Sequence, residues 1–154
     1  MNKFMKLAFE RARSTMNQNI GGPFGAVIEK NGEIISVSSN TVLRDNDPTA
    51  HAEINAIRES CKKLDTYDLT GCSLYTTCFP CPMCISAIIW ANIKDVYVGC
   101  LPQDAQTIGF RDDFIYSFIN EGMQNEDILK IKHLDRNECL RLFEEYSHQN
   151  KMIY

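Results

Sequence analysis

Two short segments of the sequence carry residue types that bind transition metals. His51 and Glu53 stand two positions apart, and Cys81 and Cys84 follow within a ProCysProMetCys segment at 80–84. Two thiolates and one imidazole suit zinc, and a site with three protein ligands leaves the fourth tetrahedral position open for water. An open position distinguishes a catalytic zinc site from a structural one. We therefore expect a catalytic zinc site held by His51, Cys81 and Cys84.

Glu53 adds a group that can move protons beside this metal. Bound zinc lowers the pKa of its water towards neutrality, so that hydroxide can attack a ring carbon that bears an amino group. Glu53 would take the proton of the water and then deliver it to the ring nitrogen and the departing amine. The order HxE…PCxxC is the signature of zinc-dependent nucleobase deaminases. The sequence thus predicts a hydrolytic deaminase with Glu53 as its catalytic residue.

Both motifs fall at predicted helix starts. Apolar residues repeat at three- and four-residue spacing over 50–64 after AspProThr (47–49), and Pro82 begins a second helical segment that runs to Trp90. The positive end of a helix dipole favours thiolates. Residues two apart in a helix point in different directions, so His51 and Glu53 can serve one site only around a helix end.

The other elements follow from hydrophobic periodicity and turn residues. We expect helices at 3–17, near 112–120 and at 135–148, strands at 24–28, 34–39, 73–77 and 95–99, an alternating segment at 128–133, and a hairpin turn at Asn31-Gly32. Strands alternate with helices after the hairpin, which predicts a mixed sheet with helices on its faces. We expect residues 1–154 to form a single domain.

Composition indicates the cellular compartment and the classes of ligand that the protein is expected to have. No apolar run approaches the roughly 20 residues of a membrane span, and charges interrupt the N-terminal segment where a signal peptide needs apolar residues. Seven cysteines, an odd number, without an export signal favour a reducing, cytoplasmic setting. The net charge of −4 disfavours a polyanionic partner, so nucleic acid is an unfavoured ligand.

Beyond the metal motifs, several segments carry a family likeness. They are GlyGlyProPheGlyAlaVal (21–27), AspProThrAlaHisAlaGlu (47–53), ProCysProMetCys (80–84) and GlyPheArgAspAspPheIleTyr (109–116). With them the sequence resembles the cytidine deaminase superfamily and, within it, the bacterial guanine deaminases. The resemblance implies a three-layer α-β-α sandwich around a mixed five-stranded sheet, and deamination of guanine to xanthine and ammonia.

The same resemblance implies roles for five further residues. Phe24 and Trp90 would be walls of the base pocket, Asn40 would hydrogen-bond the purine, and Asp112 would contact its polar edge. Tyr154 would close the site of a partner subunit, which implies a domain-swapped homodimer. The alternatives are core aromatics for Phe24 and Trp90, a turn residue for Asn40, a helix N-cap for Asp112 and a disordered tail for Tyr154.

Two positions depart from the family pattern. Phe79 stands where family members usually carry Glu before the ProCys pair, and Arg111 replaces an acidic residue beside Asp112. Both changes fall where the substrate is selected.

Three other functions compete with guanine deamination. A tRNA adenosine deaminase shares the zinc motifs, but the predicted last helix is acidic on balance rather than basic. Another small base or nucleoside, such as cytosine or guanosine, could fit. A non-enzymatic zinc module would need a fourth protein ligand, for which Cys78 is the candidate.

Overall fold

A mixed four-stranded sheet forms the centre of the unit Met1–Tyr116. The computed structural model describes all 154 residues, of which Ser117–Tyr154 form a second unit. The strand order is β2 (Glu33–Ser39), β1 (Gly25–Lys30), β3 (Cys72–Cys78), β4 (Asp95–Cys100), with β1 antiparallel to both neighbours and β3 parallel to β4.

The turn between β1 and β2 is the predicted one. Asn31 and Gly32 both have positive φ angles, of 54° and 85°, as a type I′ hairpin requires.

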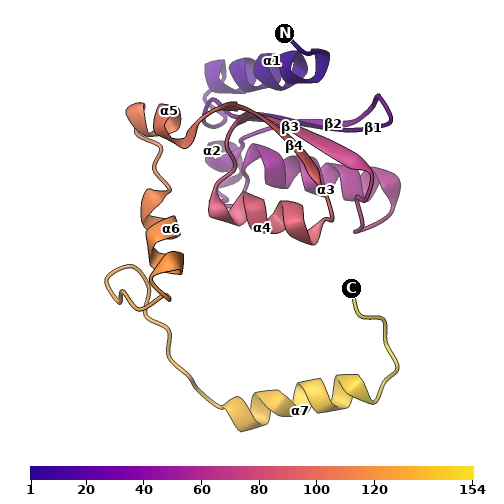
Figure 1. Cartoon of the computed structure of the whole chain (residues 1–154), viewed down its shortest axis with the longest axis vertical. Coiled ribbons are helices and arrows are strands. Elements are labelled where there is room, and N and C mark those ends of the chain that lie inside the picture. The colour runs from indigo at the N-terminus through magenta and orange to yellow at the C-terminus, as the bar shows by residue number, and fades with distance from the viewer. The chain divides into compact units, whose positions relative to one another are not determined.

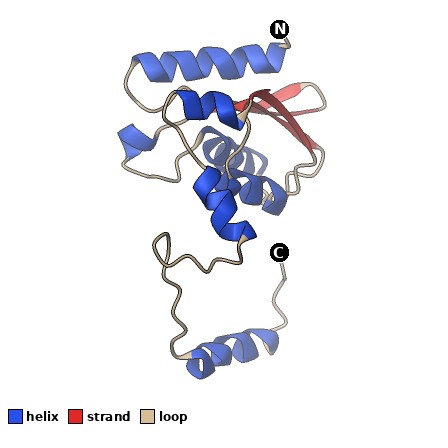
Figure 2. Ribbon diagram, turned by 60° about the vertical axis from the view of Figure 1, so that its left-hand side comes forward, coloured by secondary structure: helices blue, strands red, loops and turns tan.

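Helices cover both faces of this sheet. Helix α1 (Lys3–Asn17) buries Phe4 and Ala8 against one face, while α3 (Ala52–Leu64) and α4 (Pro82–Trp90) pack against the other (Figure 1). Successive residues of β1 serve opposite faces: Val27 contacts the α1 side, and Ala26 and Ile28 contact the α3 and α4 side. Figure 2 shows the strands in red between these helices. The three-layer arrangement of the prediction is therefore present.

Two short helices were not predicted, namely α2 (Val42–Asp45) and α5 (Pro102–Thr107). The predicted helix near 112–120 is α6 (Asp113–Asn120), and the predicted last helix is α7 (Arg136–Ser147) in the second unit. No helix has both the length and the apolar character that a membrane span requires.

The number of strands differs from the expectation. The sheet has four strands rather than five, and the alternating segment at 128–133 forms no strand. An alternating pattern becomes a strand only where another strand edge offers hydrogen-bonding partners, and residues 128–133 have no such partner here.

Candidate active site

Three of the four motif residues line a cavity of about 480 Å³ in the first unit. His51, Glu53 and Cys81 line it together with Phe24 and Asn40. The ends of β1, β2 and β3, the N-termini of α3 and α4, and the loop before α6 all contribute to its wall. The cavity therefore lies where the β1–β2 hairpin, strand β3 and the N-termini of α3 and α4 meet.

His51, Cys81 and Cys84 form the candidate metal group. His51 Nδ1 lies 3.5 Å from Cys81 Sγ and 3.6 Å from Cys84 Sγ, and the three ligand atoms lie within 4.8 Å of one another. Tetrahedral zinc with ordinary Zn–S and Zn–N bonds places sulfur and nitrogen ligands about 3.5 Å apart. The three side chains thus match zinc in donor chemistry and in spacing.

Local backbone geometry explains how the three ligands meet. His51 and Cys81 are the N-caps of α3 and α4, and both have extended dihedral angles, with ψ of 158° and 168°. Cys84 lies in the first turn of α4, where Pro82 occupies the start of the helix. Two helix N-termini therefore present their positive ends to the thiolates.

Hydrogen bonds among these three side chains shift their pKa values. A hydrogen bond with Cys84, followed by one with His51, lowers the pKa of Cys81 to about 4. The hydrogen bond with the Cys81 thiolate raises the pKa of Cys84, and a hydrogen bond with Cys81 raises the pKa of His51. One thiolate is thus preformed, and a zinc ion would replace the remaining proton on Cys84.

Glu53 lies beside the metal group in the first turn of α3. Its side chain is buried, with Oε1 accepting a hydrogen bond of 2.7 Å from Thr76 Oγ1 and Oε2 lying 3.5 Å from Cys84 Sγ. Burial raises the pKa of Glu53 above its ordinary value. A carboxylate that binds protons more readily than usual, next to a zinc site, has the properties of a general base.

Two aromatic rings form an apolar wall of the cavity. Phe24 and Phe110 pack edge to face, with ring centroids 4.9 Å apart. A Cβ atom at Gly22 would come within 2.9 Å of the Phe24 ring and 3.1 Å of the Phe110 ring, so a larger residue there would force these rings to shift. The exposed face of such a pair suits a planar heterocycle.

Asn40 is buried directly after β2, and its side chain lines the cavity. Its Oδ1 accepts hydrogen bonds from the backbone N–H groups of Gly22 and Val42, both at 3.2 Å. These bonds occupy the oxygen, which leaves the amide nitrogen as a donor for a ligand. The side chain is thereby oriented before any ligand arrives.

The family-model comparison agrees with this geometry. The model of the cytidine and deoxycytidylate deaminase zinc-binding region matches residues 1–100. The chain belongs to this family. All three metal-binding candidates and Glu53 lie inside the matched region.

Individual deaminases are similar over much of the chain. The guanine deaminase of Bacillus subtilis is 50% identical over 125 residues, which make up 81% of this chain and 80% of that protein. An X-ray structure of guanine deaminase from the same species has a TM-score of 0.92 at 44% identity, covering 100% of this chain and 99% of the other. The tRNA-specific adenosine deaminase of Aquifex aeolicus is 44% identical over 98 residues, 64% of each chain.

The residues expected around the substrate divide into two groups. Phe24, Asn40 and Asp112 line the cavity of this deaminase, and burial raises the pKa of Asp112. Trp90 is the last residue of α4, is 78% exposed and does not line the cavity. Tyr154 ends the second unit. Within the first unit, the structure therefore places Phe24, Asn40 and Asp112 at the cavity and Trp90 away from it.

The two departures from the family pattern also lie at the cavity. Phe79 and Arg111 both line it, but the guanidinium of Arg111 makes two hydrogen bonds, of 3.0 and 2.8 Å, to the carboxylate of Asp113. Cys78 lines the cavity as well, yet its thiol points to Leu101 O at 3.7 Å and it is not in the metal group. Burial raises the pKa of Cys78 to about 11, so this thiol stays protonated at neutral pH.

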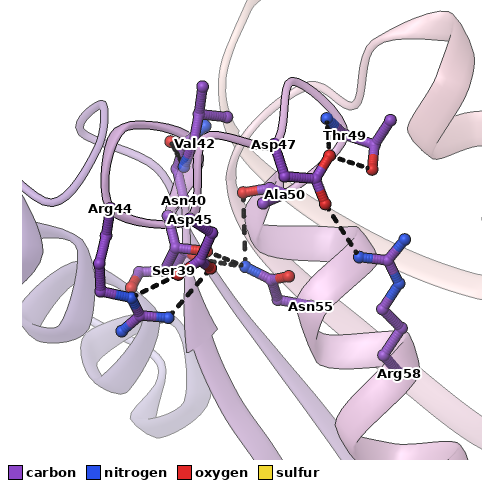
Figure 3. Close-up of polar contacts among 11 residues, drawn as sticks. Ser39, Asn40, Val42, Arg44, Asp45, Asp47, Thr49, Ala50, Asn55 and Arg58 are labelled. Carbon is purple, nitrogen blue, oxygen red and sulfur yellow. Dashed lines mark hydrogen bonds and ion pairs between the residues drawn. The ribbon is translucent and has the colours of Figure 1, made fainter.

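A polar network behind the cavity was missed by sequence reasoning. Figure 3 shows Asn55 of α3, whose Nδ2 lies 2.9 Å from Ser39 O, 2.9 Å from Thr41 Oγ1 and 3.4 Å from Ala50 O. One side chain thus ties the strand end before Asn40 to the residue before His51. The sequence shows only an asparagine one helical turn after the metal motif. This position alone does not reveal hydrogen-bond partners that are distant in the sequence.

A second part of the same network fixes the loop that precedes His51. Asp47 Oδ1 accepts hydrogen bonds from the backbone N–H and the hydroxyl of Thr49, at 2.8 and 2.7 Å, and Arg58 of α3 lies 3.6 Å from the other oxygen (Figure 3). The hydrogen bonds with Thr49 lower the pKa of Asp47. This loop is thus anchored to the helix that it precedes.

Proposed function

We propose that this deaminase converts guanine and water to xanthine and ammonia. The observation that carries the proposal is the meeting of His51, Cys81, Cys84 and Glu53 at a cavity with an aromatic wall and a preoriented amide. The extent of similarity to the Bacillus subtilis guanine deaminase supports guanine over other bases.

His51, Cys81 and Cys84 would hold the zinc, which supplies a Lewis acid that acidifies water at the open coordination position. Glu53 accepts one proton of the attacking water as the oxygen adds to the amino-bearing ring carbon, and passes it to the neighbouring ring nitrogen. The proton left on the added oxygen then passes through Glu53 to the amino group, which leaves as ammonia. One carboxylate acts as base and as acid in turn, so the reaction needs no second acidic residue.

The cavity walls bind and orient the base. One ring of the perpendicular Phe24–Phe110 pair offers its face to the ring plane and the other offers its edge, and Asn40 Nδ2 donates a hydrogen bond to an acceptor on the purine edge. Asp112 accepts from an N–H group of the base. Guanine offers acceptors on one part of its rim and donors on another, which matches an amide donor paired with a carboxylate acceptor.

We also propose that the chain works as a cytoplasmic homodimer, with 1–154 as one functional domain and the C-terminal segment, including Tyr154, crossing to the partner. Each unit leaves large apolar side chains exposed: Ile89, Trp90 and Tyr97 in the first, and Leu142 and Phe143 in the second. Such surfaces are usually covered by protein.

The open edge of β4 supports a fifth strand, with residues 128–133 of the partner as the candidate. Seven free cysteines suit a reducing compartment.

Ammonia release tests the substrate proposal. Purified zinc-loaded protein is assayed against guanine, guanosine, cytosine, cytidine, adenine, adenosine and a tRNA anticodon stem-loop, with Glu53→Gln as the blank. We expect turnover of guanine. Turnover of only the stem-loop would instead identify a tRNA adenosine deaminase, which the acidic balance of α7 disfavours because RNA binding requires basic surfaces.

A further inference from the structure

Thr76, a fully buried residue of the central strand β3, contacts the catalytic machinery without lining the cavity. Its Oγ1 lies 2.7 Å from Glu53 Oε1 and 3.1 Å from Cys78 O. A hydroxyl has one hydrogen, and the shorter contact to a carboxylate oxygen takes it because charge-assisted hydrogen bonds are the stronger ones. Thr76 therefore donates to Glu53.

The second side-chain contact of Glu53 cannot donate a hydrogen bond once zinc is bound. Cys84 Sγ is the other side-chain atom within hydrogen-bonding distance, and a thiolate that ligates zinc has no proton to donate. Thr76 is then the remaining side-chain donor to this carboxylate. Rotation about the last side-chain torsion of glutamate has only a shallow preference, so a single fixed donor decides which way the carboxylate faces.

We propose that Thr76 is a positioning residue that anchors Oε1 of Glu53 and leaves Oε2 as the atom that takes and returns the proton. The inference rests on the proton-transfer role proposed for Glu53. The hydrogen bonds of Thr76 go to Glu53 Oε1 and Cys78 O rather than to a metal-ligand side chain, and Thr76 does not line the cavity.

The strand makes Thr76 a rigid anchor. Its ladder partners are Ala26 on β1 and Val98 on β4, so its backbone is held on both sides, whereas Glu53 belongs to α3 in the layer above the sheet. The hydroxyl thus ties the reacting carboxylate of a helix to the sheet. A preoriented base avoids reorganisation during the reaction.

Three variants test the inference. Thr76→Val keeps the shape of the side chain and removes the hydroxyl, while Thr76→Ser keeps the hydroxyl. Thr77→Val is the matched control, because the Thr77 hydroxyl accepts a hydrogen bond from Gly25 N at 3.0 Å and does not line the cavity. The measurements are kcat, KM, zinc content, and crystal structures of the zinc-loaded forms.

We expect Thr76→Val to lower kcat roughly 10- to 100-fold, as the loss of a hydrogen bond to a charged group predicts, with KM and zinc content unchanged. Thr76→Ser and Thr77→Val should stay within about threefold of the original kcat. In the crystal structures, the Glu53 carboxylate should turn away in Thr76→Val and keep its orientation in Thr76→Ser.

An unchanged kcat in Thr76→Val, or equal losses in Thr76→Val and Thr76→Ser, would overturn the inference. If Thr76→Val does not fold, Thr76→Cys replaces it, because a thiol is a weak donor of similar size. A full kcat in that variant would also overturn it. The crystal structures do not depend on the substrate, so a protein that fails to deaminate guanine contradicts the proposed function and leaves the positioning of Glu53 still testable.

Discussion

Substitution of Glu53 by Gln separates the proposed chemistry from the structural role of the site. The amide keeps the length and shape of the side chain. Its oxygen can accept the hydrogen bond from Thr76 that now reaches Oε1 at 2.7 Å, and its nitrogen can donate to the thiolate of Cys84, which lies 3.5 Å from Oε2. We therefore expect the fold and the zinc to be retained.

The expected loss of rate follows from the two roles of one carboxylate. A positioned general acid or base contributes roughly 10²- to 10⁴-fold to a rate. Glu53→Gln removes both functions at once, because an amide takes up no proton at neutral pH. We expect kcat for guanine to fall by about 10³-fold or more. Equilibrium binding of guanine should change little, because the proposed base contacts come from Phe24, Asn40 and Asp112, which line the cavity.

The assay measures ammonia release, zinc content and thermal unfolding on the same preparations. Glu59→Gln on the same helix is the control, because its Oε2 accepts a hydrogen bond of 2.7 Å from Ser38 and it does not line the cavity. The Tm of metal-free Glu53→Gln should be no lower than that of the original protein, since burial already disfavours the charge on Glu53. A zinc-bound Glu53→Gln variant with full activity would refute the proton shuttle.

Three further outcomes follow from the same structure. Asn55→Ala removes the hydrogen bonds to Ser39, Thr41 and Ala50, so the free energy of unfolding in urea should fall by about 1–3 kcal/mol, and an unchanged value would show that the network is dispensable. Cys78→Ser should retain one zinc per chain by elemental analysis, whereas loss of zinc would support a closed site in which Cys78 is the fourth ligand. Deletion of residues 152–154 should raise KM roughly tenfold or more while zinc stays bound, as the loss of one good contact predicts, and unchanged kinetics would count against closure of the site by Tyr154.

Local sequence signals predicted much of the fold because they act within a few residues. Pro82 marks the start of α4, and the helix runs from Pro82 to Trp90 as predicted. Asn31-Gly32 supplies the positive φ angles of the hairpin. The fifth strand was different, because the alternation at 128–133 does not tell which edge could pair with it.

The position of His51 shows how a small error in a helix boundary matters. The helix was expected from residue 50, but α3 begins at Ala52 and His51 is its extended N-cap, with φ of −71° and ψ of 158°. The extended backbone directs the imidazole towards Cys81 and Cys84, while Glu53 leaves from the first helical turn. Because the helix begins two residues later than expected, His51 and Glu53 can both serve one site at its N-terminal end.

Residues that act through distant neighbours could not be predicted. Phe110 packs on Phe24 across a separation of 86 positions, and Thr76 reaches Glu53 from the central strand. Thr76 has an ordinary residue type in a buried strand, and Phe110 is a half-exposed loop residue whose local sequence does not reveal its partner. Only the packing of helices on the sheet brings them to the site, and that packing is not encoded in a local motif.

The departures at Phe79 and Arg111 have unequal consequences for substrate choice. A cation at 111 would be expected to repel the electron-poor N–H groups of a base and to attract its electron-rich acceptor atoms, but the guanidinium is already paired with Asp113 at 2.8 Å. The segment 111–113 therefore carries a net charge of −1, the sum of one arginine and two aspartates. Phe79 has no such compensation, because it lines the cavity with an apolar ring where the family usually supplies a carboxylate. Selectivity among bases should thus depend more on Phe79 than on the more conspicuous change of charge at Arg111.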